Sequence, residues 1–569
     1  MTRQAQHGNT DTAHSGRRVA IFGAGPGGLT AAHELIERGF EVDLYERHER
    51  VGGKCRSFAV AESGRDGRAD LPGEVGPHAF IGAYQNIGET LMRIPIGGDR
   101  NLTDNLVPGV ALGHIALEGN YFTVPVTIYP ALLRKEGVRQ LAAVLPSTVR
   151  MAKRFGLPDI VSFVSKTIAL ATSGDRRRWE QLEHMSVAEY FGGAQMSPTM
   201  RKILVTYLQG TPAQPEAVSA RTFVLGSPAS VGMVSVLSGR FGPGFKHMLN
   251  FANGPMNEAI FEPWAAYLRS RGVRIHLQHK LTALHCKETR LIGATVHDAH
   301  GAKHSVQADW YVLSVPADKA AGLMSRELIK ADPRLERISQ IGKSWLGCMQ
   351  VNLRRAADLP SVVFTLGQPW TIACVNPTRG IWERNLQDHY GDGEVVEQLS
   401  IDVATWDAPG IIYGKSAREC TGHELLAEIR AQLRNEIGDT TLLPDSDIHS
   451  CVLNPALSFS ESGFIVHDEP GFVSAPGEGH CHPDATTAID NLFLGASYVR
   501  TGSGIDSMDS ANEAGKRAAQ GVLTASDSLT LMPRIFEHSS LPRPIRWLWR
   551  LDDRRYAKGK RNIFDIVGA

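Results

Sequence analysis

The chain has 569 residues, of which 42% are hydrophobic, and it carries 60 basic and 60 acidic side chains. This length is sufficient to bury a sizeable core and predicts more than one domain. Because the formal net charge is zero, the protein has no global basic field with which to hold nucleic acid. No nucleic-acid partner is therefore expected.

The cysteines and the apolar runs indicate the compartment. Seven cysteines are scattered without CxxC spacing, which is typical of a reducing compartment rather than of a disulfide framework. Residues 1–17 are polar, predict a disordered extension and lack the apolar core of a signal peptide. Nowhere do about twenty apolar residues occur together. We expect a cytoplasmic protein that does not span a membrane, and contact with the cytoplasmic membrane face stays open.

The folded part of the chain begins with a strand, a turn and a helix. An apolar run starts at Val19, a glycine-rich segment follows, and apolar residues then recur at helical spacing from Leu29 to Ile36. A second strand at 40–45 alternates apolar and acidic side chains and ends before Glu46. These elements predict one complete βαβ unit.

The later elements follow from periodicity and turn residues. Residues 90–250 predict mainly helices and loops, with apolar stretches at 141–145 and 160–171. Four short strands between 273 and 315 predict a β-meander that returns to the first domain. The expected elements are helices at 256–271, 424–437 and 508–522, and strands at 273–277, 281–284, 291–296, 311–315, 346–353, 361–366 and 491–495.

A glycine-rich turn joins the first strand to the first helix, with the GxGxxG spacing of dinucleotide-binding proteins. Gly23 makes the turn, Gly25 lets a diphosphate approach the backbone, and Gly28 lets helix and strand pack closely. Glu46, at the end of the second strand, can accept hydrogen bonds from a ribose diol. The predicted cofactor contacts are Gly23, Ala24, Gly25, Pro26, Gly27, Gly28 and Glu46.

Two further segments identify the dinucleotide by resemblance. The stretch ERHERVGGK at 46–54, and the stretches at 491–498 and 507–511, resemble the flavin motifs of the flavin amine oxidase and carotenoid desaturase superfamily. The resemblance implies FAD as the cofactor, and amides at the start of the last helix would stabilise negative charge on the reduced flavin. This motif usually carries an acidic residue where Ser497 stands. The further contacts that the resemblance implies are Arg47, Gly52, Gly53, Lys54, Leu281, Ser497, Ser507 and Met508.

Residues 76–87, GPHAFIGAYQNI, closely resemble a stretch of the plant and cyanobacterial type phytoene and ζ-carotene desaturases, and related squalene-pathway dehydroxylases carry a similar segment. The resemblance implies that Gly76, Pro77 and His78 lie beside the flavin. His78 is a catalytic candidate that positions substrate or helps to remove a proton, with a backbone contact or a buried structural histidine as the alternative. Tyr498 and Arg500 are further candidates for holding substrate or a quinone, or else packing and surface residues. No metal site is expected, because the histidines around Cys481 lack zinc spacing.

The resemblance implies an α/β fold of the amine oxidase and desaturase type, in which a substrate-binding α+β domain is inserted into a Rossmann-type FAD-binding domain. We assign 18–90, 250–334 and 486–530 to the FAD-binding domain and 91–249 and 335–485 to the substrate-binding domain. The tail at 531–569 is basic and aromatic. Its part from 541 to 561 suits an anionic membrane surface, and a solvated or self-packed helix is the alternative.

The expected function is the removal of hydrogen from a lipophilic, isoprenoid or other lipid-like, small molecule. A hydride would pass to flavin N5, and oxygen or a quinone would take the electrons. Oxidation of an amine or amino acid, a redox-neutral isomerase or dehydroxylase, and a non-enzymatic flavin scaffold are the alternatives. The oligomeric state does not follow from the sequence.

Overall fold

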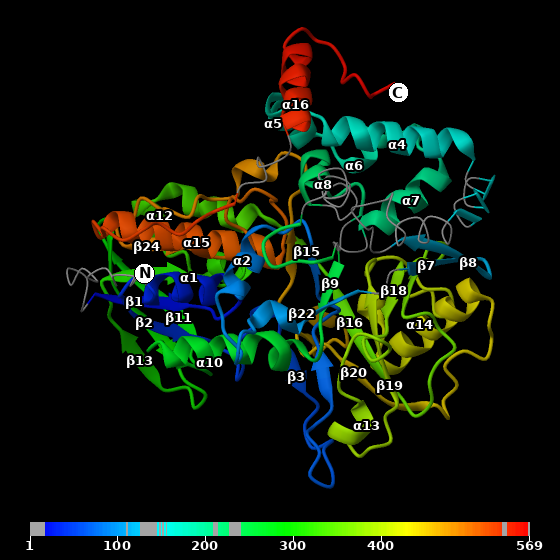
Figure 1. The fold of residues 1–569 in the computed structure, drawn as a ribbon, viewed down its shortest axis with the longest axis horizontal. Coiled ribbons are helices and arrows are strands. Elements are labelled where there is room, and N and C mark those ends of the chain that lie inside the picture. Colours follow the sequence, from blue (N-terminus) through cyan, green and yellow to red (C-terminus); the bar gives the residue numbers. More distant parts are fainter. Residues whose placement is uncertain are drawn as a thin grey trace, which may run out of the picture.

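The computed structural model describes residues 17–109, 112–125, 156–208, 214–226, 241–247, 249–536 and 543–566, together with a few residues between 145 and 154. The expected disordered extension and most of the stretch at 141–145 lie outside these ranges. Figure 1 shows a helix-covered parallel sheet in one half of the molecule and a larger sheet with helices above it in the other. None of the helices in these ranges combines the length and apolarity needed to cross a bilayer.

The first half is built on a five-stranded parallel sheet in the order β10-β2-β1-β14-β24. Both of its faces are apolar, because Val19 and Ile21 of β1 point to one face while Ala20 and Phe22 point to the other, and all four are buried. Sheets of this kind are covered on both sides. The strands are β1 (Arg18–Phe22), β2 (Glu41–Tyr45), β10 (Arg274–His276), β14 (Trp310–Leu313) and β24 (Leu492–Leu494).

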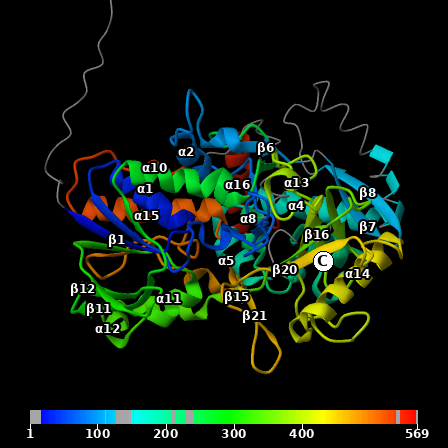
Figure 2. The ribbon, with the colours of Figure 1, turned by 90° about the horizontal axis from the view of Figure 1, so that it is seen from below.

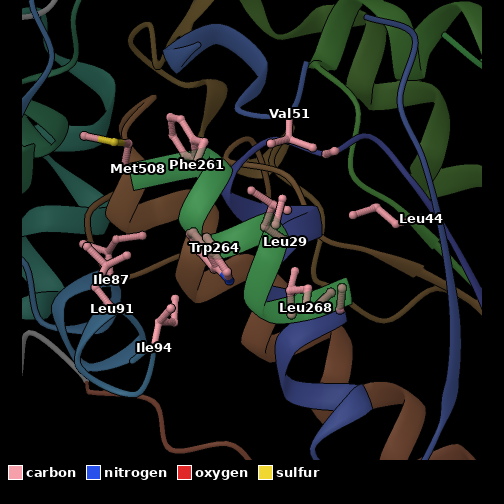
Figure 3. Packing of buried hydrophobic residues seen from close by; sticks show 14 of the residues in the cluster. Leu29, Leu44, Val51, Ile87, Leu91, Ile94, Phe261, Trp264, Leu268 and Met508 are labelled. Atoms are coloured by element: carbon pink, nitrogen blue, oxygen red, sulfur yellow. The ribbon is translucent and has the colours of Figure 1, made fainter. Parts of the chain in front are cut away.

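Helices cover one face of this sheet, and Figure 3 shows how their side chains interlock, with Trp264 and Leu268 beside Leu29. The other face is covered by an antiparallel sheet and two short helices. The first group is α1 (Pro26–Ile36), α2 (Asn86–Met92), α10 (Glu262–Ser270) and α15 (Met508–Ala525), and the second is β11 (Lys280–Lys287), β12 (Arg290–His297), β13 (Lys303–Val306), α11 (Ala317–Leu323) and α12 (Arg326–Ala331).

One expectation for this half is wrong in part, and another is confirmed with an unexpected local geometry. The strands expected at 273–277 and 311–315 are β10 and β14 of the parallel sheet, and only β11–β13 form the meander, because periodicity reports burial but not the pairing partner. The helix expected at 256–271 is present, and it begins as a π-helix at Asn257–Phe261 before α10. Pro263 has no N–H to give to the carbonyl of Ala259, which instead accepts from Asn105 Nδ2 at 2.8 Å.

The second half contains a seven-stranded sheet in the order β20-β16-β19-β18-β17-β7-β8. Its apolar face packs on α14 (Gly422–Ile437), where Val351 and Ile401 meet Leu425 and Ile429. Both predicted inserted segments contribute strands to this sheet, while the domain boundaries themselves stay a prediction. The strands are β7 (Leu112–Leu117), β8 (Asn120–Pro125), β16 (Gly347–Leu353), β17 (Val362–Thr365), β18 (Ile372–Val375), β19 (Glu397–Val403) and β20 (Ile448–Leu453).

A layer of helices lies above this sheet, and α16 stands on it at the top of Figure 1. Seen from below, in Figure 2, the strands and α14 of the second half lie beside α1, α10 and α15 of the first. The helices of this layer are α4 (Leu157–Ala171), α5 (Asp175–Glu180), α6 (Val187–Phe191), α7 (Pro198–Leu208), α8 (Ala220–Gly226) and α16 (Arg543–Tyr556). The short helix α13 (Leu386–His389) lies at the lower edge of Figure 1.

Small sheets complete the described part. They contain β3 (Ser57–Ala59), β4 (Pro72–Glu74), β5 (Ala79–Ile81), β6 (Leu106–Pro108), β9 (Leu249–Ala252), β15 (Gly342–Ser344), β21 (Leu457–Phe459), β22 (Ile465–His467) and β23 (Gly471–Val473). The sheets β3–β4, β15–β23 and β21–β22 have two strands each, and β5, β9 and β6 form a three-stranded sheet in the order β5-β9-β6. The predicted class, an α/β fold with a substrate domain that mixes helices and sheet, is confirmed.

Candidate functional site

The glycine turn at the start of α1 is shaped by close backbone contacts. Gly23 has φ of +101°, and a Cβ there would lie 2.4 Å from the Ser314 carbonyl oxygen. A Cβ on Gly28 would lie 1.8 Å from the Gly23 carbonyl oxygen. Neither position accepts a side chain, so both glycines are required by the fold itself.

The first turn of α1 is open to a ligand at Gly25, where a Cβ would meet only the Gly53 Cα at 3.7 Å. Gly25 is the N-cap, it offers no side-chain cap, and the first turn contains no acidic residue. Pro26 occupies the first turn, where its missing N–H has no cost. The remaining amides and the positive end of the helix dipole therefore suit a diphosphate.

Glu46 ties the second strand to the glycine turn. Its Oε2 accepts the Ala24 N–H at 2.7 Å, and its Oε1 accepts the His48 N–H at 3.0 Å. A carboxylate has about four acceptor positions, so two remain for a ribose diol. The His279 N–H donates to the Glu46 carbonyl at 2.7 Å, which brings the start of β11, and with it half-buried Leu281, to this end of the sheet.

The segment after Glu46 divides into two parts. Gly52 donates its N–H to the Ala24 carbonyl at 2.8 Å, which places Gly53 and Lys54 at the glycine turn. Arg47, in contrast, forms ion pairs with Asp468 and Glu469. If Arg47 also contacts the cofactor as predicted, its guanidinium has to serve both the cofactor and these two carboxylates.

Glu469 is the centre of a buried group of charges. Arg47, His48 and Arg56 all contact its carboxylate, and together they hold the pKa of Glu469 well below its ordinary value although burial opposes this. The sequence pattern did not single out Glu469, because it lies more than 400 positions from these partners.

The start of α15 is fixed by a serine and an aspartate. Ser507 is the N-cap and accepts the Ser510 N–H at 3.2 Å, directly before Met508. Buried Asp509 accepts the N–H groups of Asn86 and Ile87, each at 2.8 Å. The sequence analysis missed Asp509, which caps α2 and thereby holds the GAYQNI segment against the flavin motif.

His78 lies on the segment between β4 and β5. It hydrogen-bonds to the backbone of Gly76, and burial lowers the pKa of its imidazole to about 4. Its Nδ1 is inaccessible and has no partner in the described part of the chain. The ring is therefore neutral at neutral pH, and a neutral imidazole is able to accept or donate one further hydrogen bond.

The face of the seven-stranded sheet that points away from α14 is polar and buried. Gln398 Nε2 donates to the Pro72 carbonyl at 2.8 Å and to Asn352 Oδ1 at 2.9 Å. A Cβ on Gly76 would lie 3.9 Å from Asp402 Oδ1, so residues 72–76 lie along this face. Both amide atoms of buried Gln350 lack a partner among the described residues. This face of the sheet is therefore polar although it is buried. Burying an amide without a partner lowers stability.

Glu74 is a second titratable group that the sequence analysis missed. It is buried on β4, and its Oε1 accepts the Met256 N–H at 3.0 Å. Burial, with a smaller contribution from Glu258, raises the pKa of its carboxyl to about 8. Glu74 is therefore protonated at neutral pH, and perturbed groups of this kind gather at functional sites.

The structure places the other two catalytic candidates elsewhere. Tyr498 is completely buried in the apolar cluster on the face of the parallel sheet that points away from α1. The Arg500 side chain is half exposed and donates to the His482 carbonyl at 3.3 Å. These positions favour the packing and surface interpretations, and a catalytic role for either residue stays a prediction.

The comparison with known proteins fits this geometry. The family described as flavin containing amine oxidoreductase matches residues 26–352, more than half of the chain. The chain belongs to this family. Membership confirms the predicted flavin cofactor, and the open helix start at Gly25 and the spare acceptors of Glu46 fit FAD.

Individual relatives span nearly the whole chain. A zeta-carotene desaturase of Synechocystis sp. is 23% identical over 89% of this chain and 97% of its own length. A 15-cis-phytoene desaturase of Synechococcus elongatus is 22% identical over 90% of this chain and 97% of its own length. The solved structure of cyclohexylamine oxidase from Brevibacterium oxydans has a TM-score of 0.57, 13% identity, and covers 90% of this chain and 99% of its own. At this identity the structure shows a common fold.

Proposed function

We propose that this member of the family is an FAD-dependent desaturase or dehydrogenase that removes two hydrogens from a lipophilic, isoprenoid or other lipid-like, substrate and leaves a new C=C bond. The observation that carries the proposal is the match to two carotenoid desaturases over 97% of their own length. The amine oxidase comparison supports the fold alone, so oxidation of an amine is the weaker candidate.

When bound, FAD supplies the two-electron chemistry. The start of α1 would bind the diphosphate, Glu46 would bind the ribose, and the start of α15 would direct amides and a positive dipole end to the flavin ring. Neutral His78 would position the substrate or take its proton.

The test is an anaerobic titration of the bound flavin with a carotenoid precursor or squalene-like lipid, and separately with a panel of amines. We expect the lipid to bleach the oxidised-flavin band and to lose two hydrogens by mass spectrometry. Bleaching by amines alone contradicts the desaturase, and conversion of the lipid to an isomer or a dehydroxylated product supports the redox-neutral alternative.

A pair of variants tests the role of His78. His78→Asn keeps a polar side chain of similar reach, and we expect it to retain FAD while bleaching slows about 100-fold. Arg354→Gln removes a guanidinium from the exposed Arg354–Glu394 ion pair and serves as the control with unchanged rate. If the flavin is bleached at the same rate in His78→Asn and in Arg354→Gln, His78 has a structural role only.

We further propose oxygen or a quinone as the electron acceptor, and a cytoplasmic protein that contacts the membrane face through α16. One face of α16 is docked, since Trp549 Nε1 donates to the Ala171 carbonyl at 2.9 Å and Asp552 pairs with Arg177. The opposite face presents Trp547, which is 61% exposed, beside exposed arginines. An amphipathic helix of this kind suits anionic lipid.

Vesicle sedimentation tests this contact. Trp547→Ala combined with Arg550→Glu removes the aromatic side chain and reverses one charge on the exposed face, so we expect binding to anionic vesicles to fall several-fold, by about 1 kcal/mol per basic residue near the surface. Neutral vesicles are the control. If wild type and the double variant sediment equally with anionic vesicles, membrane contact through α16 is contradicted.

A further inference from the structure

Lys54 reaches the cofactor region from the glycine turn. It follows Gly53, which has φ of +56° and lies so close to the start of α1 that a Cβ on it would approach the Gly25 Cα to 2.9 Å. The ammonium group of Lys54 forms an ion pair with Asp506. Lys54 thus links the diphosphate-binding end of α1 to a residue more than 400 positions away.

Ser497 and Asp506 reach the same place from the carboxyl-terminal part of the chain. Ser497 follows Gly495, whose carbonyl oxygen would lie 2.0 Å from a Cβ on Gly27 in the first turn of α1. Asp506 immediately precedes Ser507, the N-cap of α15. The group therefore lies between the first turns of α1 and α15, which would hold the diphosphate and the flavin ring of a bound FAD.

The contacts of Asp506 leave acceptor capacity for a ligand. Its Oδ1 accepts from Ser497 Oγ at 2.6 Å, and its Oδ2 accepts from Lys54 and from the Phe472 N–H at 3.2 Å. A carboxylate offers about four acceptor positions, so one remains. The side chains of Lys54 and Asp506 are 26% and 19% exposed, which means that the pair is not sealed in the core.

We propose that Asp506 is a flavin-positioning residue whose carboxylate accepts a hydrogen bond from a ribityl hydroxyl of FAD, with Ser497 fixing its orientation and Lys54 balancing its charge. Ribityl hydroxyls are donors, and a carboxylate is the strongest neutral-pH acceptor for them. Members of the superfamily usually place the acidic residue at the position of Ser497. In this chain Ser497 instead holds the carboxylate of Asp506 at hydrogen-bond distance. This role of Asp506 concerns the flavin and does not depend on which substrate the protein takes.

The test is a binding cycle on the full-length apoprotein, read by quenching of flavin fluorescence. The ligands are FAD and FAD analogues that lack the 2′-, 3′- or 4′-hydroxyl of the ribityl chain. We expect wild type to bind one analogue about tenfold more weakly than FAD, and Asp506→Asn to bind FAD about tenfold more weakly while losing the discrimination against that analogue. Asp445→Asn, which opens the exposed Arg430–Asp445 ion pair, is the control. Its dissociation constants for FAD and for the analogues should equal those of wild type.

A swap variant keeps the test decisive if Asp506→Asn folds poorly. Ser497→Asp with Asp506→Ser returns the carboxylate to the position that is usual in the superfamily and keeps the net charge. We expect FAD affinity within about threefold of wild type, with discrimination restored. If Asp506→Asn discriminates among the analogues just as wild type does while FAD binds equally well, or if the swap fails to restore discrimination, Asp506 serves only as an ion-pair partner of Lys54 and the proposal is overturned. Because the readout is flavin binding, failure of the lipid titration has no bearing on this result.

Discussion

The two large sheets of the molecule differ in what their faces meet. The parallel sheet is apolar on both faces, and helices cover one face while an antiparallel sheet covers the other. The seven-stranded sheet is apolar toward α14, but toward residues 72–76 it presents buried amides and a carboxylate. A sheet that serves only packing has no need of a buried polar face, because burying polar groups lowers stability unless they are bonded.

This difference fits the proposed division of the chain into an FAD-binding and a substrate-binding region. Around the parallel sheet, function resides at strand ends and helix starts, and the sheet itself is a rigid support. In the second sheet, polar side chains such as Gln350 stand on the strands themselves. Substitutions that affect stability alone should therefore gather in the first sheet, and substitutions that exchange stability for function should gather in the second.

The largest effect is expected at the glycine turn. In Gly28→Ala the new Cβ meets the Gly23 carbonyl oxygen at 1.8 Å, so we expect a loss of more than about 3 kcal/mol in unfolding free energy together with loss of bound flavin. Gly25→Ala is the matched variant, since its Cβ finds only ordinary contact. It should keep the fold, lose less than about 1 kcal/mol, and bind FAD more weakly. Urea unfolding and flavin content measure both, and equal destabilisation of the two variants contradicts the assigned roles.

A smaller effect compares the two faces of the seven-stranded sheet. Ile401→Ala on the apolar face leaves a cavity against α14 and should cost about 3 kcal/mol. Gln350→Met on the polar face replaces an amide without partners in the described ranges by a side chain of similar volume, and should change stability by less than about 1 kcal/mol or increase it. Thermal unfolding checks both. A loss as large as that of Ile401→Ala would mean that the Gln350 amide is bonded and structural.

A further effect, small per pH unit, is a pH dependence that arises from Glu74. Its pKa is raised from 4.5 to about 8 in the folded chain, so the folded state binds the proton that the unfolded state has lost. The contribution to stability is complete below about pH 4.5, falls as pH rises, and is gone above about pH 8, with a slope of at most about 1.4 kcal/mol per pH unit. Glu74→Gln stays neutral and should flatten this slope, which unfolding curves from about pH 5 to pH 9 measure. An unchanged slope would assign the pH dependence to other groups.

The sequence by itself determined the cofactor end of the molecule. The GxGxxG turn, Glu46 and the helix at α15 were predicted from periodicity and spacing, because their geometry depends on residues that are close in the chain. The resemblance to desaturases rested on the same local motifs. Local patterns determine which face of an element is buried. That was sufficient to predict the strands of the parallel sheet, but not to predict which strands pair with each other.

Only the tertiary structure decided which distant residues complete the site. Asp506, Asp509 and Glu469 act on partners more than 400 positions away, and no local period records such a contact. The polar face of the second sheet was hidden for a related reason. Alternation along β16 and β19 predicts two unlike faces, but whether the polar face meets water or another part of the chain is set by the fold. Burial then changed the chemistry of Glu74 and His78, since a pKa depends on the surroundings of a residue and not on its identity alone.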